Sequence, residues 1–204
     1  MNKELSGYIN ARIDEFDQIE DPRIEVLQDL AQYISKKSSF TSTDLIFICT
    51  HNSRRSHMSQ IWAQIAAYHY RIKNIKTYSG GTEATAFYPR AVAALKKAGI
   101  VIEQKDSSAN PKYLVSYTDD TEKITAFSKK YSDPFNPQKK FCAVMTCSDA
   151  DEACPVVFGA EKRISLPYTD PKKYDGTAEE EAKYDERCRQ IAREMFFVFS
   201  RIKQ

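Results

Sequence analysis

Hydrophobic and polar positions follow two alternating patterns along this chain. Short, mostly apolar or β-prone segments predict strands at 45–49, 75–79, 141–145 and 163–166. Apolar residues at helical spacing predict helices at 56–72, 90–97 and 178–202. Strands that alternate with helices indicate an α/β fold, in which a central parallel four-stranded sheet is flanked by helices. Ligands of such sheets bind at the carboxyl ends of the strands.

Two further regions do not belong to this alternating pattern. Residues 1–40 show helical spacing, with a second helix starting at Asp21-Pro22, so we predict an N-terminal helical extension at 1–40 and a catalytic domain at 41–204. The extension either caps the domain or serves as a dimerisation or partner-binding arm. Residues 105–140 are polar and poorly periodic, apart from an apolar patch at 113–115.

The junction of the first predicted strand and the helix after it carries the strongest chemical signal. Cys49 ends the apolar run, and five residues separate it from Arg55, where the helical pattern begins. Backbone N–H groups, a helix N-terminus and a fixed cation all favour the thiolate, which is the nucleophilic form of cysteine. We therefore predict that Cys49 is a nucleophile.

The spacing also predicts a site for a tetrahedral oxyanion. Five residues are enough to wrap around such an anion, so that backbone amides and the helix dipole hold it. Arg55 would add a bidentate fork, which lysine cannot form, and Ser56 would donate its hydroxyl to the Cys49 sulfur. The residues predicted to bind the oxyanion are Thr50, His51, Asn52, Ser53, Arg54 and Arg55.

These motifs resemble those of a known family. The Cys-x5-Arg-Ser loop after an apolar strand resembles the low-molecular-weight protein tyrosine phosphatases and the thioredoxin-coupled arsenate reductases that share their fold. The turn at 78–82 and the helix that begins at Pro89 resemble the second βα unit of that family. The resemblance covers roughly 44–104 and 141–202.

Two loop positions depart from the family pattern. His51 stands where members usually carry glycine or another small residue, and it either narrows the anion site or takes part in binding. Arg54 stands where members often have cysteine, and we expect it to point to solvent or to recognise a substrate or partner.

A second segment distinguishes the reductases from the phosphatases. Cys147 and Cys154 lie seven positions apart after the strand at 141–145, and the segment resembles the one that carries the second and third redox cysteines of the arsenate reductases. Ordinary phosphatases of this fold lack that pair. Zinc sites usually have two to four residues between paired cysteines and contain a second pair, so zinc is disfavoured. Burial of both cysteines in the core remains an alternative.

The resemblance implies an arsenate reductase that works by a cysteine relay. Cys49 attacks arsenate while Asp170 acts as general acid, and Cys147 then attacks the Cys49 adduct and releases arsenite. Cys154 passes the disulfide on to thioredoxin or another thiol reductant. Asp133 also precedes a proline, but it comes before the strand at 141–145, whereas the acid of the family follows the last strand.

Two other functions remain open at this stage. The same nucleophile and acid would make a low-molecular-weight protein tyrosine phosphatase, with Cys49 as the nucleophile and Asp170 as the acid. The third possibility is a non-catalytic oxyanion-binding module, which would predict a broken loop or a missing acid. We interpret Cys142 and Cys188 as structural, and we expect His57 and His69 on or near a helix surface.

Composition narrows the classes of protein further. The 204 residues include 30 basic and 28 acidic side chains, and the resulting net charge of +2 gives no case for nucleic-acid binding. No apolar run is long enough to span a bilayer, and the first residues lack the apolar region of a signal peptide. Five cysteines without such a signal indicate a reducing, cytoplasmic location. We expect neither a cofactor nor a metal.

Overall fold

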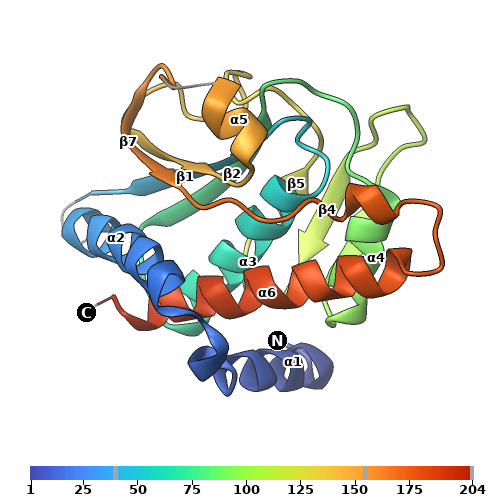
Figure 1. Cartoon of the computed structure of the whole chain (residues 1–204), viewed down its shortest axis with the longest axis horizontal. Helices are drawn as coiled ribbons and strands as arrows, with labels where there is room; N and C mark the ends of the chain where they lie inside the picture. The colour runs from blue at the N-terminus through green and yellow to red at the C-terminus, as the bar shows by residue number, and fades with distance from the viewer. Residues whose placement is uncertain (39–40, 154–155, 203–204) are drawn as a thin grey trace.

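A four-stranded parallel sheet forms the centre of the computed structural model, which describes residues 1–38, 41–153 and 156–202 (Figure 1). The strands are β1 (Thr43–Cys49), β2 (Ile75–Gly81), β6 (Phe141–Met145) and β7 (Ala160–Ser165). They lie in the order β2-β1-β6-β7, and each neighbouring pair is parallel. The predicted sheet is therefore confirmed. Because β1 and β6 are neighbours, the segments that follow Cys49 and Met145 leave the sheet side by side.

The central strands β1 and β6 are buried on both faces, as is typical of parallel sheets. Leu45 and Phe47 of β1 belong to the large core that also contains the helices α3 (Arg55–His69) and α6 (Glu180–Ser200). Ile46 and Ile48 point to the other face, where they share a smaller core with α5 (Ser148–Ala153). Period-two alternation along one strand thus divides its side chains between two cores.

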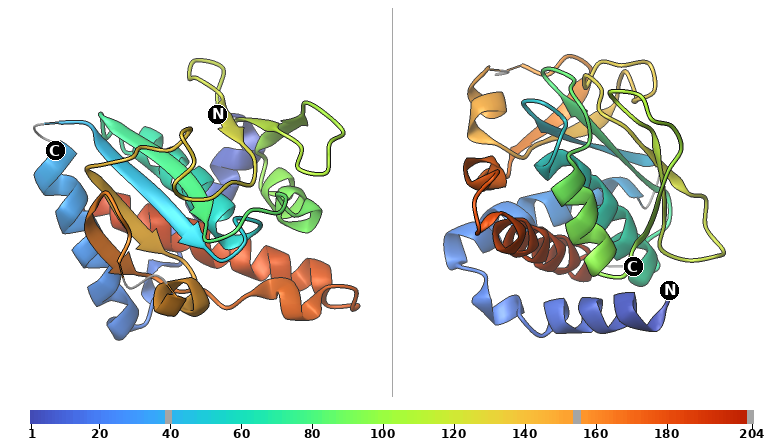
Figure 2. Two further views of the ribbon diagram at one scale, coloured as in Figure 1. Left: turned by 90° about the horizontal axis from the view of Figure 1, so that it is seen from above. Right: turned by 90° about the vertical axis from the view of Figure 1, so that its right-hand side faces the viewer.

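The N-terminal region forms α1 (Lys3–Ile13), the short 3-10 helix η1 (Phe16–Gln18) and α2 (Asp21–Ser38). Figure 1 shows α1 running below α6, and the second view in Figure 2 shows α6 between α1 and α2. Leu5 and Ile9 are buried, and the Tyr8 ring stacks on Trp62 with 5.4 Å between centroids. The apolar stripe of this region is therefore covered by the chain itself, as the cap interpretation expects.

The region that the sequence left unassigned contains a second sheet. Strands β3 (Val101–Gln104), β4 (Tyr113–Ser116) and β5 (Ile124–Ala126) pair antiparallel in the order β3-β4-β5. In Figure 2 this sheet lies beyond β2, on the side away from α2. Residues 127–140 then return to the main sheet, where Lys130 forms a parallel bridge with Gly81. Short, partly polar strands carry little periodicity, which explains why the pattern did not reveal them.

Helices α4 (Pro89–Lys97) and α6 agree with the sequence pattern, whereas the 3-10 helix η2 (Pro171–Tyr174) was not predicted. Helix α4 begins at a proline, and η2 lies between β7 and α6. The buried stripe predicted for α6 is confirmed at all its positions, namely Tyr184, Cys188, Ile191, Met195 and Val198.

Replacement of Leu5 tests whether α1 is an integral part of the core. Leu5 is fully buried, so Leu5→Ala leaves a cavity, and we expect the free energy of unfolding to fall by about 2–5 kcal/mol. Urea denaturation measures this loss, with exposed Lys3→Ala as the control in the same helix turn. Equal stability of the two variants would show that α1 is not packed on the domain in solution.

Candidate active site

The loop between β1 and α3 passes directly from a buried strand into a buried helix start. Cys49 is the last residue of β1 and is only 3% exposed, and Arg55 is the first residue of α3. The carbonyl oxygens of Cys49 and Thr50 accept hydrogen bonds from the N–H groups of Thr82 and Glu83, at 3.2 and 2.8 Å. The carbonyl groups that would repel an anion are thus occupied by the segment after β2.

Glycine at position 81 permits this close contact. A Cβ atom there would lie 2.7 Å from both Asn52 N and Thr50 O, closer than side-chain carbons approach backbone atoms. Gly81 therefore has a steric purpose, which is to let the end of β2 lie against the loop after β1, whereas Gly80 leaves room for Tyr131, whose Cα would collide with a Cβ there.

A chain of hydrogen bonds reaches the nucleophile from the segment after β5. The backbone N–H of Lys129 donates to Asn52 Oδ1 at 2.9 Å, and Asn52 Nδ2 donates to Ser56 Oγ at 2.8 Å. Ser56 Oγ lies 3.1 Å from Cys49 Sγ. Since Asn52 already donates to the serine oxygen, the serine O–H is available as a donor to the cysteine sulfur. Such a donor stabilises a thiolate.

Arg55 is held by the segment that follows β7. Its Nη1 donates to the carbonyl oxygen of Tyr168 at 3.0 Å, and its Nη2 lies 2.5 Å from Asp170 Oδ2. Asp170 also caps η2, since its Oδ1 accepts from the Lys172 N–H at 3.0 Å. The structure therefore brings the predicted acid and the predicted arginine together at the mouth of the loop. Sequence reasoning did not identify the Tyr168 carbonyl, because a backbone acceptor leaves no mark in the sequence.

Arg54 does not point to solvent, so that expectation was wrong. Its side chain is buried, with Nε donating to the Tyr184 hydroxyl at 2.5 Å and Nη2 to Asp175 Oδ2 at 2.7 Å. The guanidinium also lies over the Tyr88 ring, 4.2 Å from its centroid. Arg54 thus ties the loop to α6 and to the segment before it, and its side chain is used in structural contacts.

The other loop residues are anchored mainly through their backbones. The carbonyl oxygen of His51 accepts from the Ser128 hydroxyl at 3.0 Å, and that of Ser53 accepts from the Tyr88 N–H at 2.9 Å. The His51 ring is 38% exposed and lies 3.6 Å from a carboxylate oxygen of Glu83. This position leaves the ring at the rim of the site.

Cys147 lies beside the catalytic loop. Its Sγ is 3.5 Å from Thr50 Oγ1, the residue after the nucleophile, and it belongs to the same buried core as Cys49. The backbone N–H of Ala150 also donates to this sulfur, at 3.4 Å. The predicted third cysteine, Cys154, lies outside the described residues.

The remaining cysteines are buried thiols of the large core. Burial raises the pKa of Cys142 to about 12 and that of Cys188 to about 12, so both stay protonated at neutral pH. This agrees with the structural role that we expected for them.

Histidine 57 was placed wrongly by the sequence pattern. Its side chain is fully buried rather than near the surface, where it stacks on Phe87 with 4.0 Å between ring centroids and lies 3.2 Å from Ser79 Oγ. Burial holds its pKa well below the usual value, so the imidazole is neutral. Helix α3 is buried around most of its circumference, whereas its sequence pattern showed a single apolar stripe. His69 is partly exposed, as expected.

Asp133, the other aspartate that precedes a proline, stabilises the local turn that it begins. Its Oδ1 accepts a hydrogen bond from the Phe135 N–H at 2.9 Å. The Asp-Pro pair that contacts Arg55 is the one at Asp170.

Lys129 is an unexpected buried cation next to the loop. The side chain is almost fully buried between the Phe127 and Phe135 rings, 4.5 and 5.2 Å from their centroids, and its Nζ donates to the Phe127 carbonyl at 3.2 Å. Burial lowers the pKa of Lys129 to about 8. Nothing in the polar 105–140 sequence signalled this burial.

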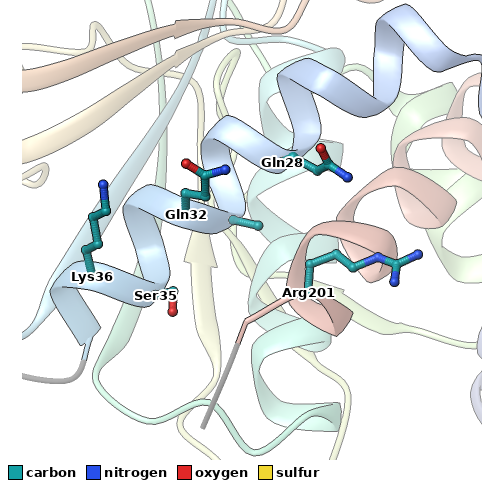
Figure 3. Close-up of a pocket in the computed structure, with 6 residues that line it drawn as sticks. Gln28, Gln32, Ser35, Lys36 and Arg201 are labelled. Carbon is teal, nitrogen blue, oxygen red and sulfur yellow. The ribbon is translucent and has the colours of Figure 1, made fainter.

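A hollow between α2 and the end of α6 is separate from this site. Figure 3 shows the residues around it, which come from α2 and from Arg201 at the end of α6. The set is Gln28, Ala31, Gln32, Ser35, Lys36 and Arg201. Since no cysteine and no carboxylate lies among these side chains, the hollow does not repeat the chemistry of the site at Cys49.

Within the described ranges there is no group of three or more His, Cys, Asp and Glu side chains that is arranged to hold a metal ion. In the same part of the chain, none of the helices is long and apolar enough to cross a membrane.

The pKa of Lys129 predicts how stability depends on pH. The folded-state pKa of about 8 lies below the ordinary value of 10.5, so the unfolded chain binds more protons between these values and stability rises with pH there. Below pH 8 the buried charge costs stability, and we expect Lys129→Met to be more stable than the parent by up to about 3 kcal/mol. This advantage should shrink as pH rises from about 8 to 10.5.

Urea denaturation across this pH range measures the difference between parent and variant. Exposed Lys130→Met is the matched control, and it should show no such pH-dependent gain. If the difference in unfolding free energy between Lys129→Met and the parent stayed constant across this pH range, the pKa of Lys129 would not be lowered by burial.

Comparison with known proteins agrees with this geometry. Residues 44–125 match the model of the low molecular weight phosphotyrosine protein phosphatase family. An arsenate reductase of Bacillus subtilis is 30% identical over 145 residues, which cover 71% of this chain and 86% of that protein. An arsenate reductase of Halalkalibacterium halodurans is 30% identical over 136 residues, covering 67% of this chain and 79% of the relative.

Solved structures show the same fold. A YwlE mutant from Bacillus subtilis superposes with a TM-score of 0.55 at 16% identity, covering 80% of this chain and all of that one. An arsenate reductase in its phosphate-binding state gives a TM-score of 0.51 at 15% identity, covering 79% of this chain and 99% of that one. Together with the relatives that are 30% identical, these matches show that the chain is an enzyme of the low molecular weight phosphotyrosine protein phosphatase family, to which arsenate reductases also belong.

Proposed function

We propose that this enzyme reduces arsenate to arsenite through a relay of Cys49, Cys147 and Cys154. The observation that carries the proposal is the position of Cys147, whose sulfur lies 3.5 Å from Thr50 Oγ1 and in one buried core with Cys49. Ester hydrolysis does not need a second thiol near the nucleophile. Reduction needs one, because a second thiolate must attack the Cys49 sulfur and form a disulfide with it. The related arsenate reductases support this choice.

In the first step, the Cys49 thiolate attacks arsenic and displaces one oxygen. The Ser56 hydroxyl stabilises the thiolate before attack, and the amides of the loop hold the remaining oxygens. Asp170, next to Arg55, would donate a proton so that the displaced oxygen leaves as water. The product is an arsenic–sulfur adduct on Cys49, with arsenic still pentavalent.

In the second step, Cys147 reduces the arsenic. Its thiolate attacks the Cys49 sulfur, a disulfide bond forms, and the arsenic–sulfur electron pair leaves with arsenic as arsenite. Two thiols are oxidised and arsenic is reduced by two electrons, so the step balances. The Ala150 N–H that donates to Cys147 Sγ favours the attacking thiolate.

In the third step, Cys154 attacks Cys147 and releases the Cys49 thiolate. The new disulfide then needs an external dithiol, and thioredoxin is the proposed reductant. Val156 and Phe158 follow Cys154 closely in the chain and are 64% and 81% exposed. Two exposed apolar side chains so near Cys154 in the sequence favour a protein reductant over a small thiol, because a protein can cover them.

Hydrolysis of aryl phosphates is the second candidate function. Phosphate has the shape and charge of arsenate, and the contact of Arg55 with Asp170 beside the nucleophile suits phosphoryl transfer equally well. Cys49 would form a phosphocysteine that water hydrolyses, and Asp170 would protonate the leaving phenol. Cys147 would then have no chemical role, which separates the two functions.

Loss of Cys147 distinguishes reduction from hydrolysis. We expect Cys147→Ser to abolish arsenate reduction and to leave p-nitrophenyl phosphate hydrolysis within about threefold of the parent, since only reduction passes through this sulfur. Arsenite release and nitrophenol absorbance measure the two activities. Cys142→Ala, which removes a protonated core thiol, is the control and should keep both.

Thiol mapping gives an independent test of the same relay. Reduced parent protein treated with arsenate should contain a disulfide between Cys147 and Cys154. If no disulfide forms and aryl phosphate turns over rapidly, the enzyme is a phosphatase and not a reductase.

Replacement of the proposed acid tests its role in either function. Asp170→Asn keeps the shape of the side chain but cannot donate a proton, so kcat should fall by about 10²–10⁴-fold. Asp133→Asn is the matched control, because it changes the other aspartate that precedes a proline and should keep kcat. The opposite pattern, a loss only in Asp133→Asn, would assign the acid to position 133.

A further inference from the structure

A polar cavity of about 370 Å³ lies next to the segment that holds Arg55. Residues 167–169 form one wall, the region around η1 and the start of α2 forms another, and α6 closes it. Its charged lining consists of three arginines and three glutamates, namely Arg23, Arg187, Arg193, Glu20, Glu186 and Glu194. The two signs balance in number, so the ligand that the cavity favours is decided by the arginines that these glutamates leave without a hydrogen-bond acceptor.

Arg187 is the central side chain of this cavity. It is only 8% exposed, and within residues 1–38, 41–153 and 156–202 no group accepts a hydrogen bond from its Nε. Its contact with Glu186 is 3.8 Å long, beyond hydrogen-bond distance, and Glu186 already pairs with Lys183 at 2.8 Å. A buried guanidinium without a close acceptor is costly, and burial accordingly lowers the pKa of Arg187.

A second arginine on the same cavity also has an unused donor. Arg193 Nη1 donates to Gln18 Oε1 at 3.0 Å, but its buried Nε has no acceptor among the described residues. Arg23 differs, because its Nε and Nη2 both contact Glu194 Oε2, at 3.0 and 2.8 Å, and neutralise that carboxylate. The cavity therefore presents two guanidinium groups whose hydrogen-bonding capacity is not filled by the carboxylates beside them.

We propose that this cavity is a second binding site for a small tetrahedral oxyanion, held by Arg187 and Arg193. Phosphate and sulfate have the negative charge and the several acceptor oxygens that guanidinium donors prefer. This proposal concerns a site outside the catalytic loop and does not depend on whether the enzyme reduces arsenate.

The position of the cavity gives such an anion an influence on the active site. Tyr168 and Thr169 line the cavity, and the Tyr168 carbonyl accepts the hydrogen bond from Arg55 Nη1. An oxyanion on the cavity side would hold this segment between two arginines. Occupancy would therefore stabilise the position of the residues that orient Arg55 and Asp170.

Calorimetric titration of the full chain with inorganic phosphate, and separately with sulfate, tests the site. We expect a binding event that persists in Arg55→Met, which removes the anion ligand of the catalytic loop, and that disappears in Arg187→Met. Arg193→Gln should weaken the same event. Arg90→Met, which removes a half-exposed arginine on α4, is the control and should leave it unchanged.

The stability of Arg187→Met provides a second readout. Without phosphate, its unfolding midpoint should equal or exceed that of the parent, because the variant removes an unpaired buried charge. Added phosphate should raise the midpoint of Arg55→Met more than that of Arg187→Met. Unchanged phosphate binding in Arg187→Met, or a large loss of its stability in the absence of phosphate, would overturn the proposal. Loss of arsenate reduction alone would not.

Discussion

The hydrogen bond from Asn52 to Ser56 is the interaction on which the catalytic loop depends. It occurs because Asn52 has φ of 44°, a left-handed conformation that asparagine tolerates better than most residues and that turns the chain back toward the helix start. With the Asn52 amide donating to Ser56, the hydroxyl proton is left for the Cys49 sulfur. A backbone conformation in the middle of the loop thus positions the hydrogen-bond partner of Cys49.

The regions outside the alternating strands and helices support this loop from several sides. The segment after β5 donates to Asn52 through Lys129 N and to His51 through Ser128 Oγ. At the other end, Arg54 ties the loop to Tyr184 of α6. The N-terminal helices contact the opposite side of α6, where Arg23 pairs with Glu194. The extension and the second sheet are therefore part of the framework that holds the site.

The sequence was sufficient for features that have a strong local signal. Short apolar or β-prone segments predicted the parallel sheet, and the spacing from Cys49 to Arg55 predicted the loop, because both signals depend on neighbouring residues. The burial of Arg54 and His57 was not predictable in this way, since their partners Asp175 and Ser79 lie far along the chain. The second sheet escaped because its strands are short and partly polar. Tertiary contacts determine these features, and such contacts leave no periodic pattern in the sequence.

The pairing of Arg55 with Asp170 sets the order of events in the site. The two side chains contact each other at 2.5 Å, so the Asp170 carboxylate uses one of the guanidinium donors that the proposed mechanism assigns to the oxyanion. Two negative groups that compete for one guanidinium repel each other strongly in a buried setting. A proton placed between them removes that repulsion, and the same proton is the one that the departing oxygen needs. In the proposed mechanism, recognition of the substrate charge and proton donation by Asp170 would therefore use the same contact with Arg55.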